Sequence, residues 1–454
     1  MNNYIFRKYD IRGIVKTDFT DDVVADLGRA FGTFIRRDNG SRVALSGDIR
    51  DTTPRLIEMF AKGLMETGVQ VLDLGIVPTP VNYFSMFHLE IDGAVQITGS
   101  HNPPEYNGFK LSYQQRAFHS EQIQDLRVLI ENRDFESGTG SSVKVPIMED
   151  YLDMLRSKIK IERPLKVVMD CGNAAGCLTG PQVFRDLGIE VKELYCDVDA
   201  TFPNHHPDPT EDVNLADVVA LMKTGEYDLG VAYDGDADRV VVVDDKGGII
   251  RADNMMALFL PEVLKKGEGI VFDVKCSQAL EDMILRYGGR PIMWKTGHSL
   301  IKDKMKEENV KFAGEMSGHL FFADDFFGFD DAVYVSLRMA QMLSRSDVLL
   351  SALAAEIPFY HSTPELRLEC KDDAEKFKIS ESAEAYFKEN FDCITVDGVR
   401  IKFGDGWGLV RASNTQAVIV TRFEAKTLKR MNEIKDLVLG KLQEFGEITI
   451  NDEG

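Results

Sequence analysis

The sequence predicts an α/β protein with three similarly built α/β domains, followed by a smaller α+β domain. Three observations support this fold class. At 454 residues, the chain exceeds what one hydrophobic core usually supports. Apolar strands alternate with amphipathic helices up to about residue 363. The last segment instead groups several strands ahead of one long helix, from about Thr427 to Phe445.

The first domain is placed at residues 1–144. Thr52 or Thr53 suits the N-cap of its first clear helix, and Pro54 suits the first helical position. A loop rich in Gly, Pro and Asn follows the last predicted strand and covers residues 98–110. We expect strands at 42–46, 69–75 and 93–98, and helices at 55–68 and about 81–89.

The same alternation restarts twice after a polar stretch at 136–144, which gives a second domain at 145–250 and a third at 251–363. In the second domain we expect strands at 165–170, 189–195 and 228–233, and a helix at 181–188. In the third we expect helices at 254–264, 279–288 and 300–309, and strands at 269–274, 291–295 and 310–314. Each domain places a distinctive loop after a strand, where open α/β sheets usually hold ligands.

The last domain is placed at residues 364–454, with strands near 399–403, 407–413 and 417–425 ahead of the single helix. This α+β pattern is typical of a small module that closes over a site.

Charge and cysteine content exclude several classes of function. Lys plus Arg number 53 against 74 Asp plus Glu, and the net charge of −21 argues against nucleic acid or an acidic membrane as partner. An anionic substrate would need locally concentrated basic groups. The six cysteines include no C-x-x-C pair, so we expect reduced core thiols. Without a signal peptide or an apolar run of about 18 residues, a cytoplasmic protein is expected.

Ser100 is the candidate nucleophile. It lies in the turn Gly99-Ser100-His101-Asn102, and the following Pro103 disfavours a helical conformation at Asn102. We therefore expect an exposed hydroxyl. The same residues are also good turn formers, so the motif needs partners elsewhere in the chain.

Asp234, Asp236 and Asp238 alternate directly after an apolar strand and form a dense oxygen site that suits Mg²⁺. An EF-hand is rejected because Arg239 stands where that loop needs Gly, and the strand-like Val240–Val243 follows. An aspartyl-phosphate phosphatase, with Asp234 as nucleophile and Asp236 as acid, would have Thr or Val in place of Asp238. Three carboxylates suit a metal better, and an oxygen of a phosphate on Ser100 would complete its shell.

Two further turns offer groups for a sugar and a phosphate. Glu315, between glycines in Gly314–His319, presents two acceptor oxygens that suit neighbouring sugar hydroxyls. The segment Arg411-Ala-Ser413-Asn414-Thr415 combines a guanidinium with hydroxyl and amide donors, which suits a phosphate monoester. The local basic or polar groups that an anionic substrate requires are Arg7, Tyr9, Arg12, Lys110, Lys275, Lys295 and His298. No nucleotide P-loop or dinucleotide fingerprint is present in the sequence.

The motifs together resemble the α-D-phosphohexomutase superfamily, specifically the bacterial phosphomannomutase/phosphoglucomutase enzymes. The segments FRKYDIRG, TGSHNPPEYNGFK, DGDADR, KTGHS, GEMSGH and RASNT occur in the family's order and span all four predicted domains. The resemblance implies a heart-shaped molecule of three related α/β domains with mixed sheets and a smaller α+β domain, around a central cleft. Ala237 departs from the family's commoner Gly, and Gln416-Ala417 departs from its usual closing pair.

The resemblance also implies an isomerase that moves phosphate between O1 and O6 of mannose or glucose phosphates. Its cofactors would be Mg²⁺ and a hexose 1,6-bisphosphate, which serves as intermediate and activator. Ser100 would be the phosphoserine, and it would share the metal with Asp234, Asp236 and Asp238. Proton transfer or charge stabilisation would fall to Arg12, His101, Lys110 and His319. Substrate binding would fall to Arg7, Tyr9, Arg239, Lys275, Lys295, His298, Glu315, Ser317, Arg411, Ser413, Asn414 and Thr415.

Several alternatives remain open at this stage. Phosphoglucosamine mutase is the nearest, because glucose, mannose and glucosamine share the hydroxyls that Glu315 would contact; Met316 favours mannose and glucose. A sugar phosphatase and a non-catalytic sugar-phosphate sensor are more distant. The sequence does not choose between a monomer and a homodimer, and it does not identify the proton carrier.

Overall fold

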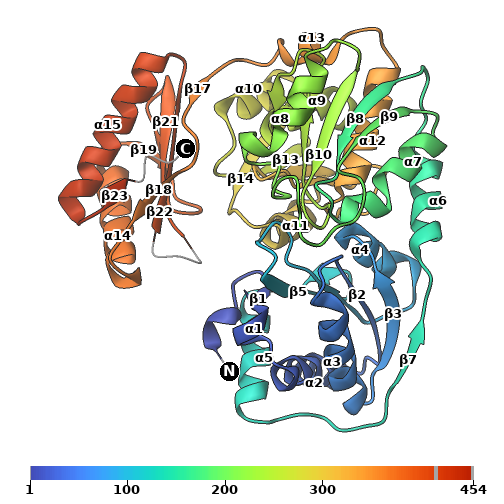
Figure 1. Cartoon of the computed structure of the whole chain (residues 1–454). Helices are drawn as coiled ribbons and strands as arrows, with labels where there is room; N and C mark the ends of the chain where they lie inside the picture. The colour runs from blue at the N-terminus through green and yellow to red at the C-terminus, as the bar shows by residue number, and fades with distance from the viewer. Residues whose placement is uncertain (1, 414–417, 451–454) are drawn as a thin grey trace. The chain divides into compact units, whose positions relative to one another are not determined.

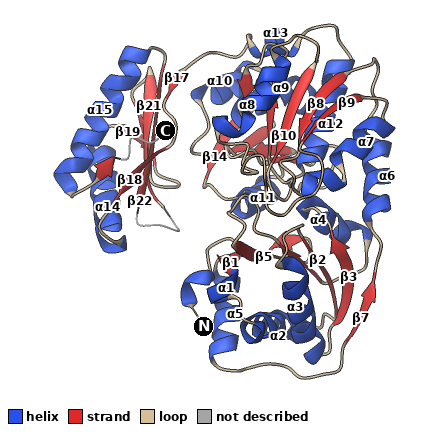
Figure 2. Cartoon of the chain, in the orientation of Figure 1, coloured by secondary structure: helices blue, strands red, loops and turns tan. Residues whose placement is uncertain are grey.

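The computed structural model describes residues 2–413 and 418–450 (Figure 1). The chain forms two compact units. The first contains the chain through Ala252 together with Ser317–Ala354, and the second contains Asp253–Met316 and the chain from Ala355 onward. Helices and strands alternate along most of the sequence, as Figure 2 shows, and the last sheet is antiparallel. The predicted fold class is confirmed.

The first sheet, in the first unit, is mixed, with its strands in the order β1-β5-β4-β2-β3-β7 and β6 beside β5. β2, β3, β4 and β7 are parallel, whereas β5 runs antiparallel to β1 and β4. The strands are β1 Ile11–Ile14, β2 Arg42–Gly47, β3 Gln70–Ile76, β4 Gly93–Ile97, β5 Tyr106–Tyr113, β6 Arg116–Ala117 and β7 Ser141–Lys144. The helices here are α1 Val15–Asp18, α2 Asp21–Arg37, α3 Thr53–Glu66, α4 Thr79–His88, α5 Glu121–Glu131 and α6 Met148–Lys158.

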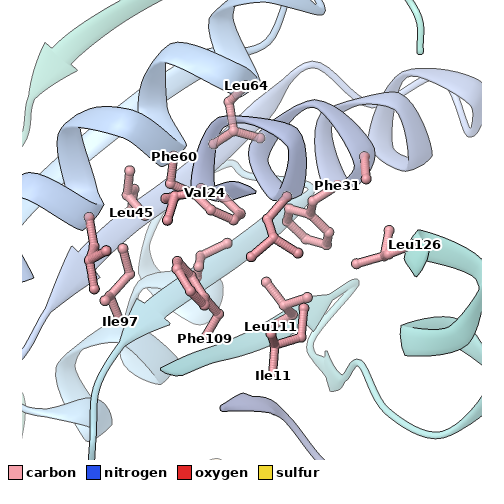
Figure 3. Packing of buried hydrophobic residues seen from close by; sticks show 14 of the residues in the cluster. Ile11, Val24, Phe31, Leu45, Phe60, Leu64, Ile97, Phe109, Leu111 and Leu126 are labelled. Atoms are coloured by element: carbon pink, nitrogen blue, oxygen red, sulfur yellow. The ribbon is translucent and has the colours of Figure 1, made fainter. Parts of the chain in front are cut away.

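A hydrophobic core lies between the first sheet and helices α2, α3 and α5 (Figure 3). Phe109 of β5 stacks on Phe60 of α3, with ring centroids 5.3 Å apart. Phe109 and Leu111 both belong to this core, and side chains alternate along a strand, so Lys110 between them points to the other face of the sheet. The core therefore fixes the direction of Lys110.

The second sheet, also in the first unit, has the order β12-β11-β10-β8-β9 and is mixed. β10 runs parallel to β8 but is joined antiparallel to β11 by the loop that carries the three aspartates. The strands are β8 Lys166–Asp170, β9 Glu190–Leu194, β10 Leu229–Tyr233, β11 Val240–Val243 and β12 Ile249–Ile250. The remaining elements of this unit are α7 Gly180–Asp186, α8 Ala216–Met222, β16 Leu320–Phe322, α12 Ala332–Ser344 and α13 Leu350–Ala354.

In the second unit, β13 runs parallel to both β14 and β15. The final sheet has the order β19-β20-β21-β22-β18-β23, with β17 beside β22. The strands are β13 Gly269–Asp273, β14 Arg290–Trp294, β15 Phe312–Gly314, β17 His361–Ser362, β18 Leu366–Glu369, β19 Asp392–Ile394, β20 Val399–Lys402, β21 Gly406–Ala412, β22 Val418–Ala425 and β23 Thr449–Ile450. The helices are α9 Ala252–Val263, α10 Gln278–Arg286, α11 His298–Glu308, α14 Asp373–Asn390 and α15 Leu428–Phe445.

Two local predictions are wrong. The loop predicted at 98–110 ends earlier, because residues from Tyr106 onward pair with β1 and β4 as strand β5. The last domain contains a second helix, α14, whose buried Ile379, Ala383 and Phe387 recur every four residues among charged neighbours. That spacing is the signal for a helix, and the highly polar composition hid it.

The cysteines are free thiols, and Cys171 and Cys276 are buried. The other four are partly exposed, so the expectation of core thiols holds only for those two. Across the described part of the chain, no helix has the length and apolar character that a membrane span requires.

Asp331 caps helix α12 with a buried, hydrogen-bonded carboxyl group. Its Oδ1 accepts from the Tyr334 amide at 2.9 Å, and its Oδ2 accepts from the Tyr151 hydroxyl at 2.8 Å. Burial raises the pKa of Asp331 to about 7. The protonated form is therefore favoured in the folded state, and stability is lost as pH rises from the ordinary pKa of 3.8 to about 7.

We predict that Asp331→Asn removes this pH dependence. Asn keeps the cap and the contact to Tyr151 but carries no ionisable proton. A shift of this size corresponds to about 4 kcal/mol of folding free energy above pH 7, as an upper bound. Melting midpoints at pH 5 and pH 8 should fall more for the wild type than for the variant. Equal falls in both proteins would contradict the prediction.

Candidate active site

Ser100 follows strand β4 and lies in the left-handed region of backbone space, with φ 48°. Its Oγ donates to Asp234 Oδ2 at 2.9 Å and lies 3.2 Å from His101 Nδ1. Only 1% of Ser100 is exposed, so the expectation of an exposed hydroxyl is wrong. The loop of the three aspartates covers it closely, because a Cβ at Gly235 would lie 2.1 Å from the Ser100 carbonyl oxygen.

Asp234, Asp236 and Asp238 occupy the tight connection from β10 to β11, and all three are buried. Asp234 Oδ1 accepts from the amides of Asp238 and Arg239, which closes the loop on itself. One carboxylate oxygen from each aspartate lies within 4.8 Å of the others. Ala237, where the family commonly has Gly, adopts φ 60°, a conformation that costs an L-residue roughly 1 kcal/mol.

Lys110 and Thr79 bind this acidic loop from the first domain. Lys110 Nζ lies 2.7 Å from Asp236 Oδ2 and 2.5 Å from Asp238 Oδ2. Thr79, the first residue of α4, donates its hydroxyl to Asp236 Oδ2 at 2.5 Å and its amide to the Asp236 carbonyl. Burial alone would lower the pKa of Lys110, but Asp236 and Asp238 raise it well above its ordinary value.

The pKa values of two of these buried carboxylates, Asp234 and Asp238, are shifted in opposite directions. Burial, reinforced by Asp238 and Asp236, raises the pKa of Asp234 well above its ordinary value. Burial acts in the same direction on Asp238, but Lys110 and His319 hold its pKa well below the ordinary value. Asp238 is therefore firmly ionised, and Asp234, which accepts from Ser100, is more easily protonated than Asp238.

The three aspartates fit a hard divalent cation. They supply carboxylate oxygens from a compact loop, the donor type that Mg²⁺ prefers. Asp236 Oδ1 is buried and has no hydrogen-bond partner among the described residues, which leaves an acceptor for an ion. Asp238, His319 and Asp330 also bring ligand atoms within 4.8 Å of one another, but His319 Nε2 accepts from Arg239 Nε at 3.2 Å, so the lone pair of that nitrogen is already used.

Basic groups surround the acidic loop. His319 Nε2 lies 3.2 Å from Asp238 Oδ1, and its Nδ1 lies 3.1 Å from Ser317 Oγ. Burial, with the positive charges of Arg239 and Arg12, lowers the pKa of His101 well below its ordinary value. Arg12 of β1 pairs with Asp10 at 2.5 Å. The local concentration of cations that the sequence required is therefore present.

Arg7 and Tyr9 precede β1 and are partly exposed. The Arg7 guanidinium stacks on the Tyr4 ring at 5.4 Å, and the Lys8 ammonium lies 5.6 Å from the centre of the Tyr9 ring. The geometry of the first unit brings together Ser100, His101, Lys110, the aspartates, Arg239 and His319.

The second unit holds a cluster of polar residues around Glu315. Glu315, directly after β15, is buried, and its Oε1 accepts from the Gly297 amide at 2.5 Å. Asp273 at the end of β13 accepts from the Met316 amide at 3.3 Å and from the Thr296 hydroxyl at 3.1 Å. The two predicted loops, KTGHS and GEMSGH, are thus joined directly by the bond between Gly297 and Glu315, and indirectly through Asp273.

Asp397 links this cluster to the segment that begins at Arg411. Its Oδ2 accepts from the Thr296 amide at 3.1 Å and from Arg411 Nε at 2.7 Å. Lys376 donates to the Ser413 carbonyl at 2.9 Å. The predicted Asn414 and Thr415 lie outside the described residues.

Lys275 follows β13 and pairs with Glu365 at 3.2 Å. Burial would lower the pKa of Lys275, but Glu365 and Asp273 raise it. Lys295 is exposed, and His298 begins helix α11 and is partly buried.

Sequence reasoning missed Thr79, Asp330 and Asp397. Each is a single polar residue without a motif, and each reaches the site through contacts more than ten residues distant in sequence. Thr79-Pro80 at a predicted helix start was the one visible signal, and it reads equally well as an ordinary helix beginning.

Comparison with known proteins shows one family along the whole length of the chain. Four profiles match in order: Phosphoglucomutase/phosphomannomutase, alpha/beta/alpha domain I at residues 3–137, domain II at 149–247, domain III at 251–360 and the C-terminal domain at 365–441. The phosphomannomutase/phosphoglucomutase of Pseudomonas aeruginosa is 45% identical over 447 residues, which are 97% of this chain and 95% of that protein.

The phosphoglucomutase of Neisseria meningitidis is 41% identical over 438 residues, covering 95% of each chain. A crystal structure of a phosphoglucomutase/phosphomannomutase family protein from Burkholderia thailandensis superimposes with a TM-score of 0.93 at 40% identity and covers 99% of each chain. The resemblance that the motifs indicated is confirmed over essentially the whole sequence. The chain belongs to the phosphoglucomutase/phosphomannomutase family of isomerases.

Proposed function

We propose that this isomerase moves a phosphoryl group reversibly between O1 and O6 of a hexose through Ser100, with a hexose 1,6-bisphosphate as intermediate. The observation that carries the proposal is the 2.9 Å hydrogen bond from Ser100 Oγ to Asp234, inside a buried group of three carboxylates. A hydroxyl held beside a divalent-cation site suits phosphoryl transfer.

Mg²⁺ would be held by Asp234, Asp236 and Asp238 together with an oxygen on Ser100. When bound, the ion would polarise the phosphoryl group and neutralise the charge that develops on it. Lys110 contributes a fixed positive charge beside Asp236 and Asp238, independent of the metal.

The transfer takes place in two steps. In the first, the bond from phosphorus to Ser100 Oγ breaks while a bond forms to the free hydroxyl of the hexose monophosphate, and that hydroxyl loses its proton. In the second, the bisphosphate has turned around: the bond from its other phosphorus to the sugar oxygen breaks while a bond forms to Ser100 Oγ, which loses the proton it took up in the first step, and the sugar oxygen takes up a proton. The product carries phosphate at the other end of the sugar, and the phosphoserine is restored.

The pKa directions suggest how the work divides among the basic groups. His101, whose pKa is lowered, is neutral and lies 3.2 Å from Ser100 Oγ, so it can exchange a proton with that oxygen. Lys110 and Arg239, whose pKa values are raised by the aspartates against the effect of burial, stay positive and stabilise charge. His319 and Arg12 are further candidates for these roles.

Both units supply proposed substrate contacts. Glu315 and Ser317 would bind the sugar hydroxyls, and Arg411, Ser413, Asn414 and Thr415 would bind the phosphate that does not react. Arg7, Tyr9, Arg239, Lys275, Lys295 and His298 would complete the set. Lys275 and Arg411 each sit beside a carboxylate, Glu365 and Asp397, so their positions are fixed before substrate arrives.

We predict that Ser100→Ala lowers turnover by at least about 10³-fold, because the covalent route is lost. Ser157→Ala, an exposed serine on α6, is the matched control and should keep full activity. The readouts are a coupled isomerase assay and phosphate labelling from glucose 1,6-bisphosphate, followed by intact mass.

The chemistry of the label separates the isomerase from a phosphatase. Phosphoserine resists hydroxylamine and acid, whereas an acyl phosphate on Asp234 would be released. Full-speed isomerisation by Ser100→Ala, with or without added bisphosphate, would overturn the proposal. A chain that binds sugar phosphates but turns none over would instead be a sensor.

We predict that Lys110→Met makes stability strongly dependent on Mg²⁺. Removing the ammonium leaves buried carboxylates without compensation, a loss of about 3–5 kcal/mol that a divalent cation can partly restore. Melting midpoints in EDTA and in Mg²⁺ test this, with the exposed Lys62→Met as control. If Mg²⁺ raises the midpoint of Lys110→Met no more than that of the wild type, the ion does not compensate for the missing ammonium, and if it raises neither midpoint, the aspartates do not bind it.

For sugar preference, we predict that mannose and glucose phosphates react with kcat/KM values within about tenfold of each other. Glu315 would contact the 3- and 4-hydroxyls that these sugars share. Glucosamine 6-phosphate should react at least about tenfold more slowly. Parallel coupled assays decide the point, and a preference for the amino sugar would make phosphoglucosamine mutase the correct assignment.

A further inference from the structure

Arg50 is a buried arginine, 2% exposed, in the loop between β2 and α3. Its guanidinium has five N–H donors, and five hydrogen bonds account for all of them. One bond goes to the Asp48 carboxylate. The other four go to backbone carbonyls of a single segment, those of Ser100, Asn102, Pro103 and Tyr106.

The four carbonyls belong to the loop that carries Ser100. Nη2 donates to the Ser100 carbonyl at 2.9 Å and to the Asn102 carbonyl at 2.5 Å. Nη1 donates to the Pro103 carbonyl at 2.6 Å and to the Tyr106 carbonyl at 3.1 Å. The loop is therefore wound around one planar cation, which fixes its path from β4 into β5.

Arg50 binds carbonyl groups of this loop, whereas the Asp48 carboxylate binds one of its backbone amides. Its Oδ2 accepts from the Gly99 amide at 2.9 Å and from Arg50 Nε at 3.2 Å. Its Oδ1 accepts from the Thr53 hydroxyl at 2.7 Å, at the start of α3. The Asp48–Arg50 pair thus binds the amide of Gly99, which precedes Ser100, and the carbonyl of Ser100 itself.

The two faces of the guanidinium are closely packed against neighbouring groups. A Cβ at Gly99 would lie 2.3 Å from Arg50 Cζ, so the backbone passes directly over the planar group. Phe202, from the second domain, covers the cation with its ring centroid 5.4 Å from Cζ. Ser100 itself keeps a φ of 48°, which a serine adopts only when its surroundings impose it.

We propose that Arg50 is a positioning residue for phosphoryl transfer: it holds the Ser100 loop so that Oγ stays within 2.9 Å of Asp234. The inference rests on the proposed role of Ser100 and goes beyond it, because the five hydrogen bonds of Arg50 go to backbone carbonyls and to Asp48. Lysine cannot replace it, since an ammonium has three donors on one atom and cannot reach four carbonyls and a carboxylate in one plane.

The test is Arg50→Lys, which keeps the charge beside Asp48 and so avoids an uncompensated buried carboxylate. We expect kcat to fall about 10²-fold through misplacement of the nucleophile, with KM for glucose 1-phosphate within about threefold of the wild type. Single-turnover phosphorylation of Ser100 by glucose 1,6-bisphosphate should slow by the same factor. Hydrogen exchange of peptides covering 98–107 should speed up while the other peptides keep their rates.

Two companion variants sharpen the result. Arg55→Lys, an exposed arginine of the adjacent α3 that pairs with Asp21, should keep the wild-type kcat, Ser100 phosphorylation and exchange. Gly99→Ala, which drives a methyl group into the guanidinium, should reproduce the Arg50→Lys loss of kcat.

Opposite outcomes separate the two proposals. If Arg50→Lys keeps kcat within about threefold, or loses it only with a matching rise in KM and global exchange, Arg50 has no positioning role. If instead the wild type carries no label on Ser100 and Ser100→Ala stays fully active, the proposed function fails and Arg50 is not implicated.

Discussion

The burial of three carboxylates in one tight loop is the constraint on which the rest of this site depends. Asp234, Asp236 and Asp238 repel one another in a medium that screens charge poorly, so they need cations of fixed position. Lys110 comes from strand β5 of the first sheet, and His319 lies 81 residues beyond Asp238 in the sequence. These cations reach the acidic loop only when elements distant in sequence have packed together, so the electrostatics of the site depend on the fold.

Strand β5 shows how that coupling is built. Phe109 and Leu111 pack into the core between the first sheet and its helices, and alternation along the strand sends Lys110 to the opposite face, beside Asp236 and Asp238. A register shift of one residue would exchange the two faces and bury the ammonium in the apolar core. The hydrophobic pattern of one strand thus sets the electrostatics of the site.

How far the sequence could predict this depends on the kind of residue. Ser100, the aspartates and Glu315 could be proposed from the sequence because each lies in a loop after a strand, and because their segments occur together in the order of the family that they resemble. Arg50, Thr79 and Asp397 were missed because each acts through hydrogen bonds to distant partners, which no local pattern encodes. The expected exposure of Ser100 was wrong for a similar reason: the loop that covers it comes from another domain, 134 residues away.

Hydrogen bonds from neighbouring segments hold two strained backbone conformations in the site. Ser100 and Ala237, on two facing loops, both adopt positive φ, at roughly 1 kcal/mol each or more. Bonds from outside each loop hold these conformations: the carbonyl of Ser100 accepts from Arg50, and that of Ala237 accepts from the Ala332 amide. Because folding already imposes the geometry, little reorganisation remains when charge moves during a reaction, and a preorganised polar site gains most of its effect in this way.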